Sequence, residues 1–96
     1  PGNDDARPVR WVLDEIIRAW GADIRWEPDT GQHPHEAGIL KLDCSKARER
    51  LGWRPRLALP AALDWTAQWY KAWQSKADPA AMCADQIARY EALAAP

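Results

Sequence analysis

The stretch His33–Arg56, HPHEAGILKLDCSKARERLGWRPR, decides how the chain is organised. A polar loop leads into the short apolar run Gly38–Leu42, which predicts a strand. Asp43 stands where an N-cap belongs, because its carboxylate can accept the free N–H groups at the start of a helix over Cys44–Leu51. Gly52 follows, and glycine favours the left-handed conformation that closes a helix. The stretch therefore predicts a loop, a strand and a capped helix.

Three further helices are predicted on either side of this stretch. Pro8 suits a first helical position, and apolar residues at three- and four-residue spacing predict a helix over 8–20, ended by Gly21. Pro60 opens a helix over about 60–75, whose apolar stripe includes three tryptophans at four-residue spacing. Asp78 and Pro79 are an N-cap and a first helical position for a last helix within 79–94. We expect that helix to turn Cys83, Ile87 and Tyr90 inward.

A second strand is predicted at Ile24–Trp26, where apolar and charged residues alternate. The chain of 96 residues is long enough for one domain, 1–96, with one modest core. The predicted fold class is therefore α-rich α/β, with about four helices and two short strands. Two short strands alone make a marginal sheet.

Composition excludes several classes of function. A net charge of −1 gives no electrostatic case for binding nucleic acid or an acidic membrane. Two cysteines are too few for a disulfide framework, and no signal peptide or apolar run of membrane-spanning length is present, so we expect a cytoplasmic protein. Seven tryptophans in so short a chain indicate that some cover a surface meant for another domain. Because the chain starts in mid-loop without Met, we expect it to be a piece of a longer protein.

Several motifs give the chain a family resemblance. A strand ending in Asp43, then x-Ser-Lys-Ala, then Leu-Gly-Trp-x-Pro, resembles the C-terminal part of the extended short-chain dehydrogenase/reductases, which include sugar-nucleotide epimerases and dehydratases. The finer match is to the CDP-glucose 4,6-dehydratase family, and it covers nearly the whole chain. The motifs that carry the finer match are Asp4-Asp5-Ala6-Arg7-Pro8-Val9, His33-Pro34-His35-Glu36-Ala37, Leu40-Lys41-Leu42-Asp43-Cys44-Ser45-Lys46, Trp69-Tyr70-Lys71-Ala72-Trp73 and Gln86-Ile87.

The resemblance implies a C-terminal substrate-binding segment of an enzyme that converts CDP-glucose to a 4-keto-6-deoxy sugar nucleotide with NAD. The implied partners are the nucleotide-sugar substrate, the chain's own N-terminal Rossmann domain and further copies in a homo-oligomer. That NAD-binding domain would lie before residue 1, since this sequence has neither the Gly-rich phosphate-binding turn nor the Tyr-x-x-x-Lys pair of the superfamily. We therefore assign no catalytic or cofactor-binding residue to this chain and expect it to be inactive alone.

The substrate-binding residues implied by the resemblance are His33, His35 and Glu36. Related GDP-mannose dehydratases have Arg-Pro-Thr-Glu here, whose Arg approaches the diphosphate and whose Glu binds ribose hydroxyls; these positions correspond to His33 and Glu36. Two other interpretations remain open. One is a solvated loop before a strand. The other is a metal site, which the spacing favours least because zinc ligands are usually separated by two to four residues.

Two alternatives to the CDP-glucose interpretation also remain. The first is an NAD-dependent epimerase or dehydratase that acts on another nucleotide sugar. The second is a free-standing helical module whose tryptophan surface binds a protein. Ser45 is interpreted as a helix-start residue, because it has no acid–base partner at a recognisable spacing. Lys46 is interpreted as structural, because it lies in the first turn of a short helix next to Asp43 and Glu49.

Overall fold

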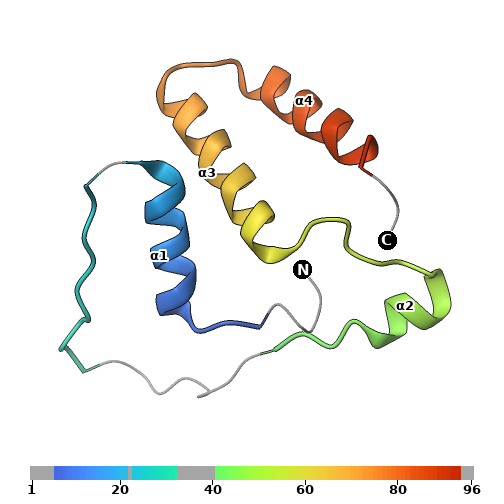
Figure 1. The fold of residues 1–96 in the computed structure, drawn as a ribbon, viewed down its shortest axis with the longest axis horizontal. Helices are drawn as coiled ribbons and strands as arrows, with labels where there is room; N and C mark the ends of the chain where they lie inside the picture. The colour runs from blue at the N-terminus through green and yellow to red at the C-terminus, as the bar shows by residue number, and fades with distance from the viewer. Residues whose placement is uncertain (1–5, 22, 33–40, 94–96) are drawn as a thin grey trace.

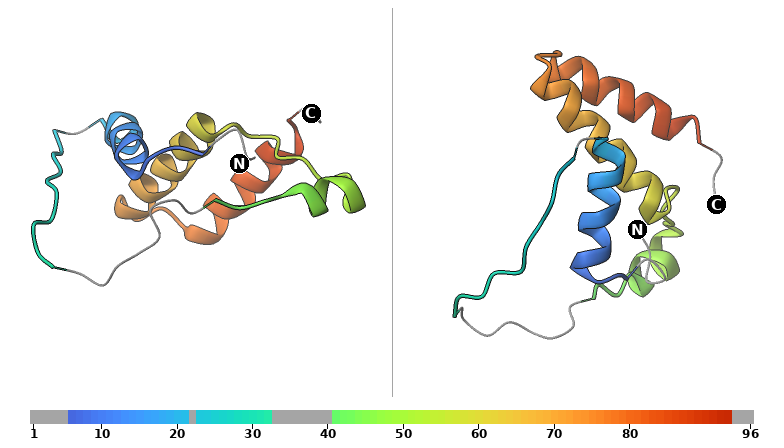
Figure 2. Two further views of the ribbon diagram at one scale, coloured as in Figure 1. Left: turned by 90° about the horizontal axis from the view of Figure 1, so that it is seen from below. Right: turned by 60° about the vertical axis from the view of Figure 1, so that its left-hand side comes forward.

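The computed structural model describes residues 6–21, 23–32 and 41–93. These residues form four helices in the order α1 (Val9–Trp20), α2 (Ser45–Leu51), α3 (Leu59–Gln74) and α4 (Pro79–Glu91). Helix α3 lies between α1 and α4 and packs against both, whereas α2 lies apart from them (Figure 1). The molecule is flat, measuring 43 × 38 × 20 Å, as the edge-on view in Figure 2 shows.

The predicted ends of α1 are confirmed. Pro8 precedes the helix in an extended conformation, and Gly21 follows it with φ of 79° in the left-handed region. The Gly21 N–H donates to the carbonyl of Ile17 at 3.2 Å, which closes the last turn. Glycine is needed here because a side chain strains this backbone conformation.

Helix α2 begins one residue later than predicted, and its N-cap is Cys44 rather than Asp43. The Asp43 carboxylate nevertheless accepts hydrogen bonds from the N–H of Ser45 at 3.0 Å and from its hydroxyl at 2.6 Å. Gly52 closes the helix as predicted, with φ of 63°, and its N–H donates to the Arg48 carbonyl at 3.1 Å. The helix start shifts by one residue because the Asp43 side chain can reach the Ser45 N–H group from the position before the N-cap residue, Cys44.

The connection between α3 and α4 is a tight turn that includes a strained residue. Lys76 has φ of 67°, and it is the one non-glycine residue of the described chain with positive φ. Its N–H donates to the Trp73 carbonyl, and the N–H of Ala77 donates to the Ala72 carbonyl, both at 3.0 Å. This pair of bonds is the Schellman motif, which demands a left-handed residue at this position. Asp78 then caps α4 by accepting from the Ala80 N–H at 3.2 Å, as predicted.

The two predicted strands are not seen, so the fold class is corrected: the described chain is helical. Ile24–Trp26 lies in irregular backbone, and the Trp26 indole N–H donates to the Asp14 carboxylate of α1 at 3.0 Å. Most of the predicted strand Gly38–Leu42 lies outside the described residues, and its last two residues are not in regular structure. A strand needs a ladder partner, and the described backbone offers none beside Ile24–Trp26.

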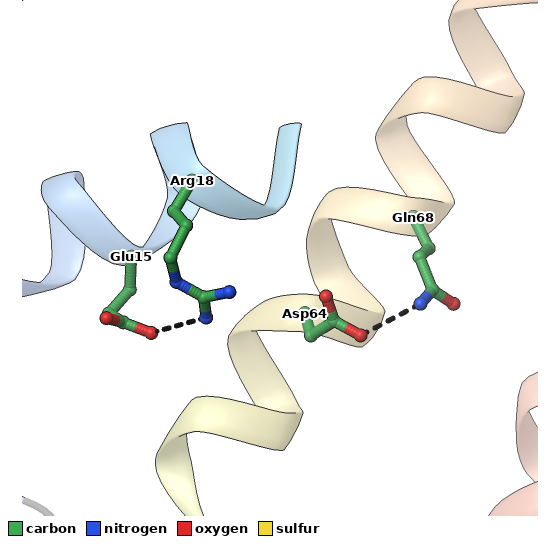
Figure 3. Close-up of polar contacts among 4 residues, drawn as sticks. All are labelled: Glu15, Arg18, Asp64 and Gln68. Carbon is green, nitrogen blue, oxygen red and sulfur yellow. Dashed lines mark hydrogen bonds and ion pairs between the residues drawn. The ribbon is translucent and has the colours of Figure 1, made fainter. Parts of the chain in front are cut away.

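The contact between α1 and α3 combines apolar packing with a polar cluster. Ala67 of α3 is 2% exposed, and it is the one buried residue of the described chain. Figure 3 shows Arg18 of α1 extending toward α3 while it pairs with Glu15, and Asp64 of α3 accepting a hydrogen bond from Gln68. The hydrogen bond from Arg18 to Glu15, 2.8 Å long, and the charge of that carboxylate raise the pKa of Arg18, and the charge of Asp64 adds to the rise.

Helix α4 faces α3 with a different side than predicted. The Gln86 amide donates to the backbone carbonyl of Trp65 at 2.9 Å, and the Arg89 guanidinium lies 4.2 Å from the centre of the Trp65 ring. Cys83 and Ile87, which were predicted to point inward, are exposed, whereas Tyr90 is half-buried. The prediction was wrong for the first two because polar and cation–π contacts, invisible to hydrophobic periodicity, fix the rotation of α4.

The expected modest core is barely formed in the described chain. Its radius of gyration is 16.3 Å, against about 13 Å for a compact domain of 100 residues. Large apolar side chains remain on the surface, including Tyr70 at 51%, Trp73 at 55% and Ile87 at 58% exposure. The three packed helices therefore leave much of their apolar surface without a partner inside the described chain.

Candidate functional site

The predicted substrate-binding residues His33, His35 and Glu36 lie outside the described residues. The described backbone that flanks them is Gln32 on one side and Lys41 on the other, and both side chains are exposed. Their assignment to a site therefore rests on the residue types and on the resemblance.

Both flanks of this stretch are held by specific hydrogen bonds. Before it, the Trp26–Asp14 bond ties the chain to α1, and the Asp29 carboxylate accepts from the Gly31 N–H at 2.8 Å to form a local turn. After it, Asp43 anchors the backbone to the first turn of α2 through Ser45. The stretch with the two imidazoles and the carboxylate is thus joined at one side to α1 and at the other to α2.

The described side chains form no cluster of three or more histidine, cysteine, aspartate or glutamate groups that could hold a metal ion. The metal site that remained open as the least favoured interpretation of His33, His35 and Glu36 concerns residues outside this part of the chain. Cys44 and Cys83 are both free thiols. The Ser45 hydroxyl donates to the Asp43 carboxylate, which fits its predicted role as a helix-start residue.

The surface of the described residues includes two depressions beside α3 and α4. The larger, of about 440 Å³, lies beside the turn between α3 and α4 and is lined by Trp73, Gln74, Lys76, Ala77 and Pro79. The smaller, of about 170 Å³, follows the seam between α3 and α4 and is lined by Gln68, Trp69, Ala72, Met82, Asp85, Gln86 and Arg89.

Neither depression has the make-up of a small-molecule site. Such sites combine a volume of about 300–1,000 Å³ with several convergent polar groups. The larger depression is open and presents a single charged side chain, Lys76, while the smaller one falls below that volume. Sequence analysis named Gln86 only as part of a family motif and did not single out Arg89. The contacts of both residues with Trp65 hold two helices together.

The tryptophan series of α3 divides between two roles. Trp65 carries the contacts to α4, and Trp69 is half-buried with its ring edge-on to Tyr70 at 5.3 Å. Trp73, at the end of the helix, is more than half exposed. The exposure of Trp73 agrees with part of the expectation for the tryptophans, and the prediction that they meet another domain stays a prediction.

A search of the described residues for a helix long and apolar enough to cross a membrane finds none. No protein-family model matches the chain.

Comparison with curated proteins finds a clear relative. The chain is 47% identical over 73 residues, 76% of its length, to CDP-glucose 4,6-dehydratase of Salmonella typhimurium. The matched part is 20% of that enzyme, so the chain spans about a fifth of the length of its relative. An identity this high over most of the chain confirms the resemblance predicted from the His-Pro-His-Glu-Ala and Leu-Asp-Cys-Ser-Lys stretches. The match is consistent with a C-terminal segment, and the chain is similar over three quarters of its length to a CDP-glucose 4,6-dehydratase.

Proposed function

We propose that this chain is the nucleotide-sugar-binding C-terminal part of an enzyme resembling CDP-glucose 4,6-dehydratase. The observation that carries the proposal is the identity of 47% over 73 residues to a dehydratase of that name. In the proposal the complete protein is a lyase of the extended short-chain dehydrogenase/reductase type. Its 4-keto-6-deoxy product would feed cell-surface polysaccharide.

The proposal assigns NAD binding and substrate binding to different parts of the complete protein. NAD would supply the redox chemistry on an N-terminal Rossmann domain, because this sequence contains no Gly-rich turn between a strand and a helix. This chain would bind the substrate, and the enzyme would act as a homo-oligomer in the cytoplasm. Its two free thiols agree with a reducing compartment.

Glu36 and His33 carry the proposed contacts to the nucleotide. The two oxygens of a glutamate carboxylate can accept hydrogen bonds from both vicinal hydroxyls of a ribose. An imidazole donates to a diphosphate oxygen, more strongly when it is protonated. His35 is proposed as a third contact from the same short stretch.

The test is a binding titration of CDP-glucose against the complete protein and its Glu36→Gln variant. Glutamine keeps the shape and one acceptor but loses the charge, and we expect the dissociation constant to rise about tenfold or more, or about 1.4 kcal/mol. Glu27→Gln is the matched control, since Glu27 is an exposed residue of the same connection between α1 and α2. NAD affinity should be the same in all three proteins.

Equal dissociation constants for wild type and Glu36→Gln would contradict the proposed contact and leave the stretch as a solvated loop. A second titration with GDP-mannose addresses the alternative substrates. Tighter binding of that nucleotide sugar than of CDP-glucose would move the proposal to another member of the same enzyme class.

A further inference from the structure

The positive charge of this chain is concentrated in one short stretch around α2. Residues 41–56 carry six basic and two acidic side chains, a net charge of +4, whereas seven basic and twelve acidic side chains elsewhere sum to −5. The basic residues of the stretch are Lys41, Lys46, Arg48, Arg50, Arg54 and Arg56. The overall charge of −1 conceals this segregation, so a conclusion drawn from the whole chain does not hold for this part of it.

Arg56 joins the stretch to the packed helices. Its guanidinium donates hydrogen bonds to the carbonyls of Tyr90 at 3.5 Å and Glu91 at 3.4 Å, at the C-terminal end of α4. Helix α2, which precedes this join, lies apart from the other three helices (Figure 1). The remaining basic side chains are therefore carried on a part of the chain that extends away from the packed helices.

Three of these cations are exposed and form no ion pair with another described residue; they are Lys46, Arg50 and Arg54. Lys46 and Arg50 are four residues apart on α2, so their side chains are neighbours on its surface. Successive residues turn about 100° around a helix, which puts Glu49 about 100° from Arg50. The two cations of α2 thus lie together, with the carboxylate of that helix to one side.

Two large apolar side chains accompany these cations. Leu51 is 81% and Trp53 is 42% exposed. The Trp53 N–H donates to the Ala47 carbonyl at 3.3 Å, so the chain folds back and keeps Trp53 against the end of α2. Ala47 itself lies between Arg50 and Leu51 around the helix. Cations and apolar side chains therefore share one half of α2.

We propose that this part of the chain attaches peripherally to an anionic membrane surface. We call it the α2 surface and define it by Lys46, Arg50, Leu51, Trp53 and Arg54. The phosphates of acidic lipid headgroups attract lysine and arginine, and the acyl boundary just beneath them accepts apolar side chains. Tryptophan is enriched at this boundary because its ring is apolar while its indole N–H is polar.

The mixture of cations and apolar groups favours a lipid layer over other partners. The core of a protein–protein interface is depleted in lysine, because an unpaired cation loses its hydration there. Single-stranded nucleic acid would use the cations and the Trp53 ring, but Leu51 would gain nothing from a phosphate backbone. A free phosphate needs a concave site, and neither depression beside α3 and α4 is lined by a residue of α2. A lipid surface uses every member of the α2 surface.

The test is flotation of the polypeptide of the complete reading frame with lipid vesicles. Vesicles of phosphatidylcholine alone are compared with vesicles in which about a third of the lipid is phosphatidylglycerol. We expect binding to the anionic vesicles, and we expect it to weaken when the ionic strength rises from about 0.05 to 0.5 M, because salt screens exposed charges. Inorganic phosphate at matched ionic strength should not compete, since a soluble anion offers no apolar layer.

Two variants separate the charges from the apolar contact. The double variant Lys46→Gln/Arg50→Gln should bind anionic vesicles about 30-fold more weakly, which is about 2 kcal/mol at about 1.4 kcal/mol per tenfold. The matched control is Arg10→Gln/Lys71→Gln, which removes the same two side-chain types from exposed positions of α1 and α3 and should bind like wild type. Leu51→Gln leaves every charge in place and should weaken binding about five- to tenfold, so the test does not depend on the folding of one variant.

Equal binding to neutral and anionic vesicles would overturn the proposal, and so would equal losses in the double variant and its control. Absence of binding to both kinds of vesicle would contradict it as well, since the complete protein would then cover the α2 surface. Tighter binding of a single-stranded oligonucleotide than of anionic vesicles at the same salt concentration would assign the surface to nucleic acid instead. No nucleotide sugar enters the assay, so its outcome is independent of CDP-glucose binding.

Discussion

Replacing Lys76 by glycine should stabilise the connection between α3 and α4. Lys76 is held at φ of 67° by the two hydrogen bonds that close α3. A non-glycine residue in the left-handed region costs about 1–2 kcal/mol. Glycine removes that cost but loses about 0.5–1 kcal/mol more conformational freedom on folding. The net gain for glycine over another uncharged residue is therefore about 0.5–1 kcal/mol.

The proper reference is Lys76→Ala rather than wild type. Lysine near the end of α3 interacts favourably with the helix dipole, by about 0.3–1 kcal/mol, and both variants lose that interaction. The difference in stability between the glycine and alanine variants therefore reports only the free energy of the backbone conformation at position 76. In thermal unfolding followed by circular dichroism, the glycine variant should melt about 2–8 °C above the alanine variant, given about 4–8 °C per kcal/mol for a domain of this size.

The same comparison in urea should move the unfolding midpoint without changing its slope, because the surface exposed on unfolding stays the same. A glycine variant that melts at or below the alanine variant would refute the reasoning. That result would mean that the left-handed turn at Lys76 is not populated in solution. The close approach of α4 to α3, which depends on this turn, would then not be populated either.

Two further changes test the helix ends. Gly52→Val should fray α2 locally, because a β-branched residue is strained at φ of 63° even though the space around Gly52 is open. We expect hydrogen exchange at the α2 amides to accelerate about tenfold, which corresponds to a cost of at least about 1.4 kcal/mol. Exchange at the α3 amides should stay unchanged. Arg56→Met removes the guanidinium that lies 5.5 Å from the centre of the Tyr90 ring, and losing this contact should cost about 0.5–1 kcal/mol. Hydrogen exchange at the α4 amides should accelerate accordingly. Equal exchange rates in the variant and the wild type would show that the contact contributes nothing to stability.

The helices could be predicted because their signals are local. Gly21 and Gly52 take the left-handed conformation that the sequence demands, and the Asp78-Pro79 pair starts α4. These features depend on the backbone of a few neighbouring residues, so the wider structure does not alter them. The same is true of the apolar period that predicts α1.

The irregular backbone at Ile24–Trp26 and the rotation of α4 could not be predicted, because both depend on partners distant in sequence. Alternation at Ile24–Trp26 is equally compatible with a strand and with an irregular segment whose indole binds Asp14. The orientation of α4 is fixed by Trp65, more than twenty residues away from its partners, and nothing in the period of α4 announces it.

The candidate site came from resemblance alone. Two histidines and a glutamate in four residues fit a metal site, a solvated loop and a nucleotide-binding loop, and no physical rule chooses among them without a second element that converges on the same point. The similarity to a dehydratase favours the third interpretation. Glu36→Gln is accordingly the variant with the greatest power to discriminate.

The Arg56 contact has a consequence for how the chain is made. The guanidinium of Arg56, which precedes α3, also reaches the backbone carbonyls of Tyr90 and Glu91 at 3.5 and 3.4 Å, so it spans 34 and 35 residues of sequence. Ordering a loop of that length carries an entropic cost that must be met before the contact forms. During synthesis, the join that fixes the end of α4 can therefore form only after α4 itself has left the ribosomal exit tunnel.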